Sequence, residues 1–138
     1  MPITVSSDKK KLDIPYIHEY LSTQSYWAKG RSMEDVITTI ENSFCFGVFQ
    51  NDKQIGFARV VTDCAVFAYI ADVFIDEKER GKGNSKILMK AILSYPTFKK
   101  VTQWSLKTLD AHSLYAQFGF AAPTEPARIM EYRATRRQ

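Results

Sequence analysis

The sequence predicts an α+β fold built on one mixed β-sheet. Three observations support this prediction: apolar residues at helical spacing near the N-terminus, two-residue alternation from Phe44 onward, and a strand-helix-strand order in the C-terminal half. The expected order is helix, helix, three strands, helix, strand, helix, strand. Strands joined by tight turns pair antiparallel and strands joined through a helix pair parallel, so the early strands should be antiparallel and a parallel pair should follow.

Two helices are expected before the sheet. The first begins at Asp13, whose carboxylate can cap free amide groups, and continues through IPYIHEYLS with a proline in its first turn. The second begins at Ser32, with Asp35 three residues on, and ends at Asn42. The loop between them is QSYWAKGR, residues 24–31.

The remaining elements follow from residue 44. FCFGVFQ and QIGFARVVT alternate on either side of the turn NDK, which predicts a hairpin, and AVFAYIADVFI (65–75) is a third strand. NSKILMKAILSY (84–95) has an apolar helical face and stops before a proline. A strand VTQWSLKT, a short helix DAHSLYAQF, a turn at Gly119 and a weaker strand near RIMEYR (128–133) complete the chain.

Length and composition indicate one globular domain, residues 1–138, because 45% hydrophobic and 25% charged residues are typical of such domains. The N-terminus lacks the apolar region of a signal peptide, and no run approaches the roughly 20 apolar residues that cross a bilayer, so we expect a cytoplasmic protein without a membrane partner. Cys45 and Cys64 form no metal-ligand pattern, so no metal is expected, and Cys45 is expected in the core.

The formal charge of +4 is compatible with binding to nucleic acid, to acidic surfaces or to a phosphorylated small molecule. Nucleic-acid binding usually adds interleaved aromatic residues or a recognition motif, and the sequence shows neither, so no nucleic-acid partner is expected. The basic residues at 9–11 and at the C-terminus are expected to be solvated. The basic stretch at 80–86 differs because it contains two glycines.

This stretch, ERGKGNSK, joins an expected strand to an expected helix. Such a turn exposes backbone N–H groups without intrahelical partners, and together with the helix dipole they attract an anion. Gly81 and Gly83 let the backbone approach a phosphate closely, while Arg80, Lys82 and Lys86 add positive charge. The residues fit neither the Walker pattern nor the dinucleotide fingerprint. The expected ligand is a phosphate or pyrophosphate, and a solvated surface turn is the alternative.

The pattern Arg80-x-x-Gly83-x-Ser85 resembles the acetyl-CoA signature of the GNAT superfamily of N-acetyltransferases, which has glycine or alanine where this chain has serine. LYAQFGF, residues 114–120, resembles the second signature of that superfamily, and the order of elements is also similar. Many members carry asparagine where this chain has Thr108, which leaves the contact of that position with the pantetheine arm open. The resemblance implies the GNAT fold, with helices on both faces of the sheet, and acetyl-CoA as co-substrate.

The resemblance also implies where acetyl-CoA binds. Its pyrophosphate would lie on the amides of residues 80–85, and its pantetheine arm would pair like an added strand in a gap where the fourth and fifth strands, 65–75 and 101–108, separate. The residues expected to bind the cofactor are Val73, Phe74, Ile75, Arg80, Gly81, Lys82, Gly83, Asn84 and Ser85.

The implied reaction is direct attack of an amine on the thioester in a ternary complex. A lysine-like amine has a pKa of about 10.4 and is mostly protonated at pH 7, so a base is needed. Asp72 is the candidate base, with a role in holding neighbouring strands as the alternative; Glu41 and His112 are weaker candidates. Tyr115 of the second signature is expected to protonate the departing thiolate, with a core tyrosine as the alternative.

The acceptor is not identified by the sequence beyond a small molecule or peptide with a primary amine. The loop between the first two helices commonly walls the acceptor site in this fold, so Tyr26, Trp27 and Arg31 are expected to line it, with Arg59 and Asp63 as further candidates. Arg31 could attract an acceptor carboxylate or be solvated, and Trp27 could belong to the core. The alternative function is a non-catalytic acyl-CoA sensor or interaction module, and a homodimer is compatible with the sequence.

Overall fold

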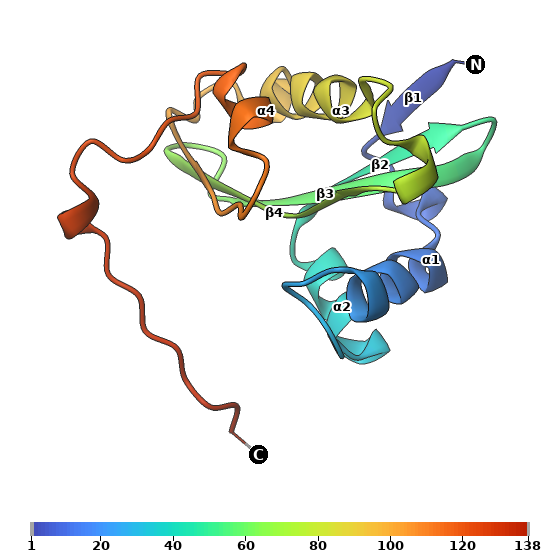
Figure 1. Ribbon diagram of the computed structural model, residues 1–138, viewed down its shortest axis with the longest axis horizontal. Coiled ribbons are helices and arrows are strands. Elements are labelled where there is room, and N and C mark those ends of the chain that lie inside the picture. Colours follow the sequence, from blue (N-terminus) through green and yellow to red (C-terminus); the bar gives the residue numbers. More distant parts are fainter. Residues whose placement is uncertain (1, 138) are drawn as a thin grey trace. The chain divides into compact units, whose positions relative to one another are not determined.

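The computed structural model describes residues 2–137 (Figure 1). Its elements, in chain order, are β1 (Ile3–Ser6), η1 (Lys9–Lys11), α1 (Ile14–Glu19), η2 (Tyr20–Gln24), α2 (Met33–Glu41), β2 (Phe44–Gln50), β3 (Lys53–Thr62), β4 (Phe67–Ile75), η3 (Glu77–Glu79), α3 (Asn84–Leu93), η4 (Pro96–Phe98), β5 (Gln103–Leu106), α4 (His112–Ala116) and η5 (Pro126–Arg128). They fall into two compact units, Met1–Lys107 and Thr108–Gln138. The first unit contains the sheet and α1 to α3, and the second contains α4.

The five strands of the first unit form one sheet in the order β1-β2-β3-β4-β5. Neighbours from β1 to β4 are antiparallel, whereas β4 and β5 are parallel and are connected through α3. The predicted mixed sheet is therefore confirmed. The β2–β3 hairpin turns at Asn51 and Asp52, both with positive φ, a backbone conformation that matches the twist of paired strands.

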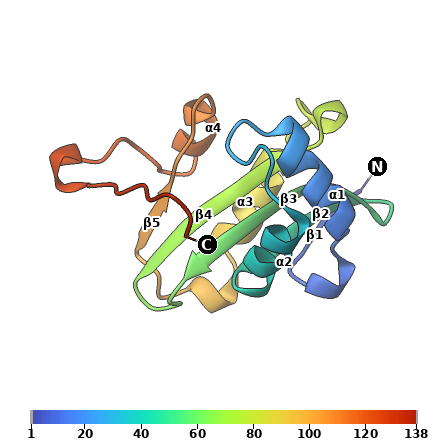
Figure 2. The ribbon, with the colours of Figure 1, turned by 90° about the horizontal axis from the view of Figure 1, so that it is seen from below.

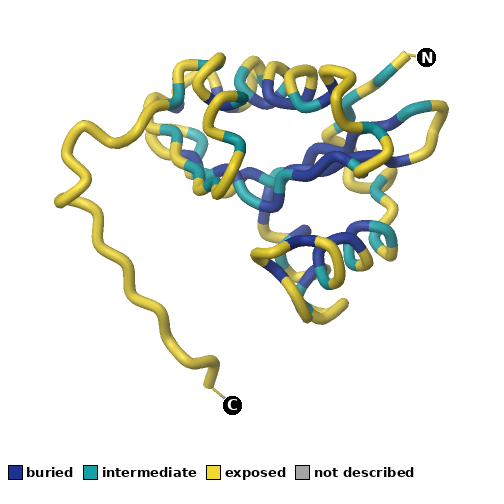
Figure 3. Tube along the Cα trace, viewed as in Figure 1, coloured by how far each residue is buried: buried dark blue, intermediate teal, exposed yellow. Residues whose placement is uncertain are grey.

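Helices cover both faces of this sheet. Figure 1 shows α3 on one face and α1 with α2 on the other. Residues of β2 and β3 are therefore buried in continuous runs instead of alternating, as expected for strands covered on both sides, and Figure 3 shows the buried sheet between partly exposed helices.

Alternate side chains of β2 enter two cores. Cys45 is buried with Phe57 and with apolar residues of α1 and α2, which confirms its expected place in the core. On the other face, Phe46 forms an aromatic cluster with Tyr95 and Phe98, with ring centroids 5.2 and 6.1 Å from its own. Both sets of contacts tie the hairpin to helical elements that surround the sheet.

The helix starts follow the local sequence signals. Asp13 caps α1 by accepting a hydrogen bond from the amide of Tyr16, and Ser32 caps α2 by accepting one from the amide of Asp35, each at 3.1 Å. Asn42 follows the last residue of α2, as predicted. α1 continues directly into η2, a π-helical turn that leads to the loop before α2.

Two expectations about strands are wrong. Strand β1 was not expected from the sequence, because four residues are too few for alternation to stand out. It pairs with β2 from Ile3↔Gln50 to Ser6↔Gly47. The strand predicted near residues 128–133 is absent, because residues 129–137 are irregular and exposed. A strand needs a neighbour for its backbone hydrogen bonds, and the described residues of the second unit contain no strand that could serve.

We predict that Gly56→Ala destabilises the protein more than Gly47→Ala. At Gly56 a Cβ would lie 2.9 Å from the backbone oxygen of Phe74 on the paired strand, which cannot move alone; at Gly47 the nearest atoms, at 2.6 and 2.9 Å, belong to the mobile ring of Phe49. Overpacking at Gly56 should lower the free energy of unfolding by about 1–3 kcal/mol, despite the better backbone preference of alanine. Urea unfolding of both variants measures this, and an equal loss or a gain at Gly56 would contradict it.

Candidate active site

The candidate site is centred on an irregularity in β4. Arg59 of β3 pairs with Ala71, whereas Phe57 pairs with Phe74, so β4 has one extra residue at this point and forms a β-bulge. Asp72 lies in the bulge with a φ of 53°, in the left-handed region where aspartate and asparagine occur more often than most residues. A bulge redirects side chains, and here it directs the carboxylate of Asp72 towards side chains of β3 and of the loop between η2 and α2.

Three side chains donate hydrogen bonds to this carboxylate. Nε1 of Trp27 lies 2.8 Å from Oδ1, while Nη1 of Arg31 and Nε of Arg59 lie 2.7 and 2.6 Å from Oδ2. Trp27 and Arg31 come from the loop between η2 and α2, and Arg59 comes from β3. These four residues, the Asp72 cluster, tie that loop to the sheet.

The protonation of Asp72 follows from its partners. Burial by itself raises the pKa of Asp72, but the hydrogen bond and charge of Arg59, the charge of Arg31 and the hydrogen bond from Trp27 outweigh it and hold the pKa below its ordinary value. A carboxylate that is hard to protonate and already accepts three hydrogen bonds is a weak base. The geometry therefore favours the alternative in which Asp72 holds neighbouring parts of the chain, and its role as a base stays a prediction.

The residues expected to line the acceptor site lie in or beside the Asp72 cluster. The ring of Tyr26 meets that of Trp27 edge-on, with centroids 5.0 Å apart, and the two side chains are 54% and 40% exposed. Trp27 is therefore not a core residue. Arg31 is not simply solvated either, since its side chain is 21% exposed and paired with Asp72.

Two supporting residues were not singled out from the sequence. Ser43 accepts a hydrogen bond from Nη1 of Arg59 at 3.2 Å, and Nε2 of His18 lies 3.1 Å from the carbonyl oxygen of Arg31. Because a carbonyl oxygen only accepts, this contact requires the hydrogen on Nε2. Neither residue carries a local sequence signal, since Ser43 lies between a helix and a strand and His18 lies within α1.

The other candidate acidic and basic groups lie elsewhere. Asp63 accepts hydrogen bonds from the amides of residues 65–67, and these bonds, that of Val66 foremost, hold the pKa of Asp63 below its ordinary value. Its carboxylate thus closes the turn between β3 and β4. Glu41 and His112 are exposed, at the end of α2 and the start of α4.

Strand β5 accompanies only the first part of β4 (Figure 2). Residues 67–70 pair with residues 103–106, and β4 then continues to Ile75; in the described chain no strand pairs with residues 71–75 on the side away from β3. The predicted cofactor-binding residues Val73, Phe74 and Ile75 all lie in this stretch. Tyr20 stacks on the ring of Phe74 with centroids 3.9 Å apart, which supports the strand from the face of α1.

The turn after β4 is held by two of the residues expected to bind the cofactor. Arg80 donates from Nε to the carbonyl oxygen of Ile75 at 3.1 Å and from Nη2 to the hydroxyl of Tyr20. Asn84 is buried and donates from its amide to the carbonyl oxygen of Glu79 at 2.9 Å. These side chains therefore shape the turn.

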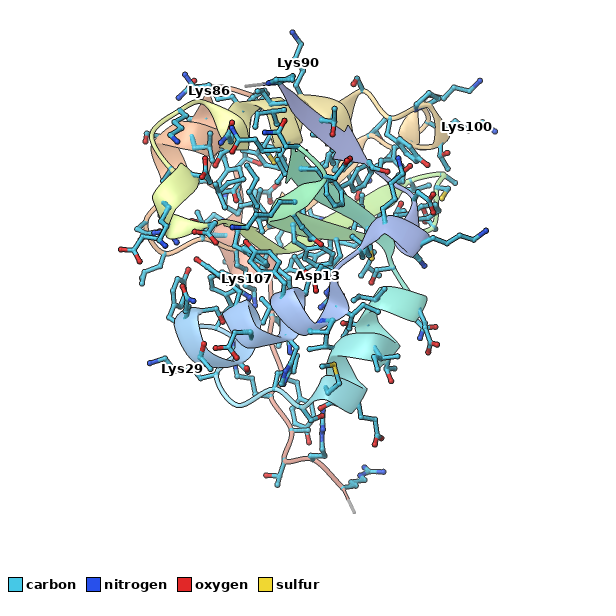
Figure 4. All side chains as sticks on the ribbon, turned by 90° about the vertical axis from the view of Figure 1, so that its right-hand side faces the viewer. Asp13, Lys29, Lys86, Lys90, Lys100 and Lys107 are labelled. Carbon is cyan, nitrogen blue, oxygen red and sulfur yellow. The ribbon has the colours of Figure 1, made fainter. Side chains whose placement is uncertain are left out.

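Helix α3 begins without a side-chain cap, unlike α1 and α2. Gly83 is its N-cap, and both Gly81 and Gly83 have positive φ, 76° and 81°. A Cβ at either glycine would meet no other atom within 4 Å. Lys82, paired with Glu79 at 3.1 Å, and Lys86 are exposed, and Figure 4 shows Lys86 extending outward from α3. Uncapped amides, open space and nearby lysines suit an anion.

Tyr115 lies in the second unit, in α4. Its side chain is buried, and its ring meets that of Phe120 at a centroid distance of 6.0 Å across the turn at Gly119, whose φ is 95°. Oγ1 of Thr108 accepts a hydrogen bond from the amide of Ala111 at 3.0 Å just before the helix. The part that Tyr115 plays in the chemistry stays a prediction.

Among residues 2–137, no group of three or more histidine, cysteine, aspartate or glutamate side chains is placed to hold a metal ion. No helix in the same residues is long and apolar enough to cross a membrane.

Comparison with known proteins identifies the family. Residues 41–122 match the model of the acetyltransferase (GNAT) domain. A candidate acetyltransferase from Gibberella zeae is 26% identical over 136 residues, covering 82% of this chain and 75% of the relative. The crystal structure of a candidate GNAT acetyltransferase from Xanthomonas campestris pv. campestris is 42% identical, with a TM-score of 0.93 and coverage of 97% and 94% of the two chains. A candidate acetyltransferase from Clostridium acetobutylicum, solved with acetyl-CoA, shares the fold at 12% identity, with a TM-score of 0.73 and 96% coverage of each chain. The match to the family model and the likeness to the Xanthomonas protein show that the chain belongs to the GNAT acetyltransferase family.

Proposed function

We propose that the protein is an N-acetyltransferase that moves the acetyl group of acetyl-CoA to a primary amine by direct attack in a ternary complex. The observation that carries the proposal is the uncapped glycine turn that opens α3 just after the unpaired end of β4. The family supports acyl transfer, and the Clostridium structure of the same fold, solved with acetyl-CoA, supports this donor. We propose that residues 1–138 act as one domain, since the family match includes residues of both units.

The turn and β4 provide the proposed cofactor site. The pyrophosphate would accept hydrogen bonds from the amides of residues 80–85, at the positive end of the α3 dipole, with Lys82 and Lys86 adding charge. The amide groups of the pantetheine arm would pair with the backbone of residues 73–75, which lacks a strand partner on that side. Arg80 and Asn84 would contribute by fixing the shape of the turn.

In the proposed reaction, the neutral amine nitrogen attacks the thioester carbon, the C–S bond then breaks, and Tyr115 gives a proton to the departing thiolate. Asp72 would take the proton of the amine only through a water molecule, because its oxygens already accept hydrogen bonds from the protein. The second candidate function, which the sequence left open, is an acyl-CoA sensor without turnover. Release of thiol from acetyl-CoA across a panel of primary amines separates the two.

We predict that Gly83→Asp weakens acetyl-CoA binding more than tenfold, which is about 1.4 kcal/mol. Aspartate tolerates positive φ better than most residues, and its Cβ would enter open space, so the variant should fold and bring a negative charge against the phosphates. Gly83→Asn, of the same size without the charge, should lose less. Calorimetry measures both affinities, and unchanged binding by folded Gly83→Asp would refute the placement of the pyrophosphate.

We predict that Tyr115→Phe lowers kcat by roughly 10²-fold with little change in acetyl-CoA affinity, because the ring stays and only the proton donor is lost. A thiol has a pKa near 8.5, so its anion needs a proton less than an alkoxide does, and the effect should lie at the lower end of general acid catalysis. Steady-state kinetics and calorimetry test this. An unchanged kcat makes the hydroxyl structural, and a parallel loss of affinity makes Tyr115 a binding residue.

We predict that the double variant Cys45→Ala, Cys64→Ala keeps its activity apart from a loss of stability of about 1 kcal/mol. Burial raises the pKa of the Cys45 thiol to about 11, so this sulfur is not a thiolate nucleophile at neutral pH. Both cysteines are unpaired, which supports a reducing, cytoplasmic site of action. Mass spectrometry of the enzyme with acetyl-CoA is the check, and an acetyl group on either sulfur that passes to an amine would overturn direct transfer.

A further inference from the structure

The Asp72 cluster carries two positive charges and one negative charge. Arg31 and Arg59 both pair with Oδ2 of Asp72, at 2.7 and 2.6 Å, and among the described residues no other carboxylate forms an ion pair with either guanidinium. Arginine stays protonated in proteins, and the guanidinium groups of Arg31 and Arg59 keep Asp72 ionised. The cluster therefore has a net charge of +1.

This excess charge is partly buried. The side chains of Arg31 and Arg59 are 21% and 16% exposed, and that of Asp72 is 2% exposed. Moving a guanidinium away from water is unfavourable unless an anion compensates for it. One arginine would suffice to tie the loop to Asp72, and Trp27 already adds a second link. The presence of the other arginine is explained if a further anion binds.

Arg31 is the arginine with more donors left for such an anion, and it is also the more exposed of the two. Arg59 donates to Asp72 from Nε and to Ser43 from Nη1, whereas in the described chain the side chain of Arg31 donates only from Nη1 to Asp72. A guanidinium has five N–H groups in a planar fork, so Arg31 keeps further donors for a carboxylate. The contact of His18 with its carbonyl oxygen holds its backbone.

The cluster adjoins the place proposed for the pantetheine arm, since Asp72 directly precedes residues 73–75 on β4, and it lies at the end of that stretch away from the proposed pyrophosphate site, where the thioester would lie. Trp27 shares the carboxylate of Asp72 with Arg31, and its partly exposed ring meets that of Tyr26, so that an aromatic surface adjoins the cluster. We propose that the acceptor is an amine that also carries a carboxylate, and that Arg31 binds this carboxylate while the amine points towards β4. This inference rests on the proposed acetyltransferase function of the same site.

The same charge pattern discriminates against cations. Both oxygens of Asp72 already accept hydrogen bonds from Trp27, Arg31 and Arg59. The carboxylate is therefore a poor partner for a second ammonium group on the acceptor. A diamine would bring an extra positive charge to a cluster that is already positive. For acceptors of equal length, we therefore expect kcat/KM to be highest for the amino acid, lower for the alkylamine and lowest for the diamine.

The test uses three probes that share an amine and a chain and differ in the charge of the far end: 4-aminobutyrate, n-butylamine and 1,4-diaminobutane, with shorter and longer homologues of each. Thiol release from acetyl-CoA by the wild-type protein gives kcat/KM for each. A charge-assisted hydrogen bond predicts that the best amino acid exceeds its alkylamine by roughly ten- to a hundredfold. The preference should decrease as salt is added.

Two variants then separate charge recognition from a purely structural role. Arg31→Gln should bring the ratio of amino acid to alkylamine close to one, and Arg31→Lys should keep part of it. Asp72→Asn, which suits the positive φ of that position, frees both guanidinium groups and should raise the ratio. A structural or proton-accepting role would lower the rates with both probes alike, so opposite changes in the ratio support anion binding.

Equal use of both probes by the wild-type protein, or an unchanged ratio in Arg31→Gln, would overturn the inference while thiol release still supports acetyl transfer. If no amine releases thiol, acetyl transfer fails instead, and calorimetric titration of 4-aminobutyrate into CoA-saturated protein decides the inference. Binding that Arg31→Gln abolishes and n-butylamine does not reproduce supports a carboxylate site. No binding, or equal binding by the variant, overturns it.

Discussion

The candidate site depends on the hydrogen bonds that the carboxylate of Asp72 accepts. Asp72 lies at a β-bulge in a left-handed conformation and accepts hydrogen bonds from Trp27, Arg31 and Arg59, which come from two separate parts of the first unit. A buried ion pair gains little net stability, because the loss of hydration of both partners offsets their attraction, but removing one partner leaves an uncompensated charge. The cluster is therefore better explained as a means of fixing the loop between η2 and α2 on β4 than as a source of stability.

Strand β4 provides the parts of the site in chain order. Pairing with β5 ends at Ile70, the bulge follows at Asp72, and residues 73–75 continue without a strand on that side in the described chain. The carbonyl oxygen of Ile75 accepts a hydrogen bond from Arg80, and the other backbone groups on that side need either water or a ligand as hydrogen-bond partner. The glycine turn and the uncapped start of α3 follow. One strand thus aligns a charged cluster, a backbone edge without a strand partner and a glycine turn, which is the order that the proposed acetyl-CoA site needs, with the acyl group at one end and the phosphates at the other.

Much of this arrangement was predicted from the sequence where the signals are local. Asp13 and Ser32 cap helices at the expected places, and Gly81 and Gly83 lie in the expected turn between a strand and a helix. Trp27, Arg31 and Arg59 were expected to line an acceptor site, which stays a prediction. Their convergence on Asp72 joins residues up to 45 positions apart and depends on a bulge that no local pattern indicates. Strand β1 was missed and a strand at 128–133 was wrongly expected for the same reason, since pairing depends on a distant partner.

The charge arrangement also suggests how an acceptor could lose its proton without a strong base. A carboxylate near an ammonium group stabilises the ammonium form and raises its pKa. In the proposed complex, Asp72 is occupied by guanidinium groups and the carboxylate of the acceptor is paired with Arg31, so neither anion remains to stabilise the ammonium group. A partly desolvated ammonium without a counter-ion has a lowered pKa, and each pKa unit increases the neutral, nucleophilic fraction about tenfold at neutral pH. The arginine that binds the carboxylate would then also favour deprotonation of the amine, so that a base as weak as Asp72, acting through a water molecule, would suffice.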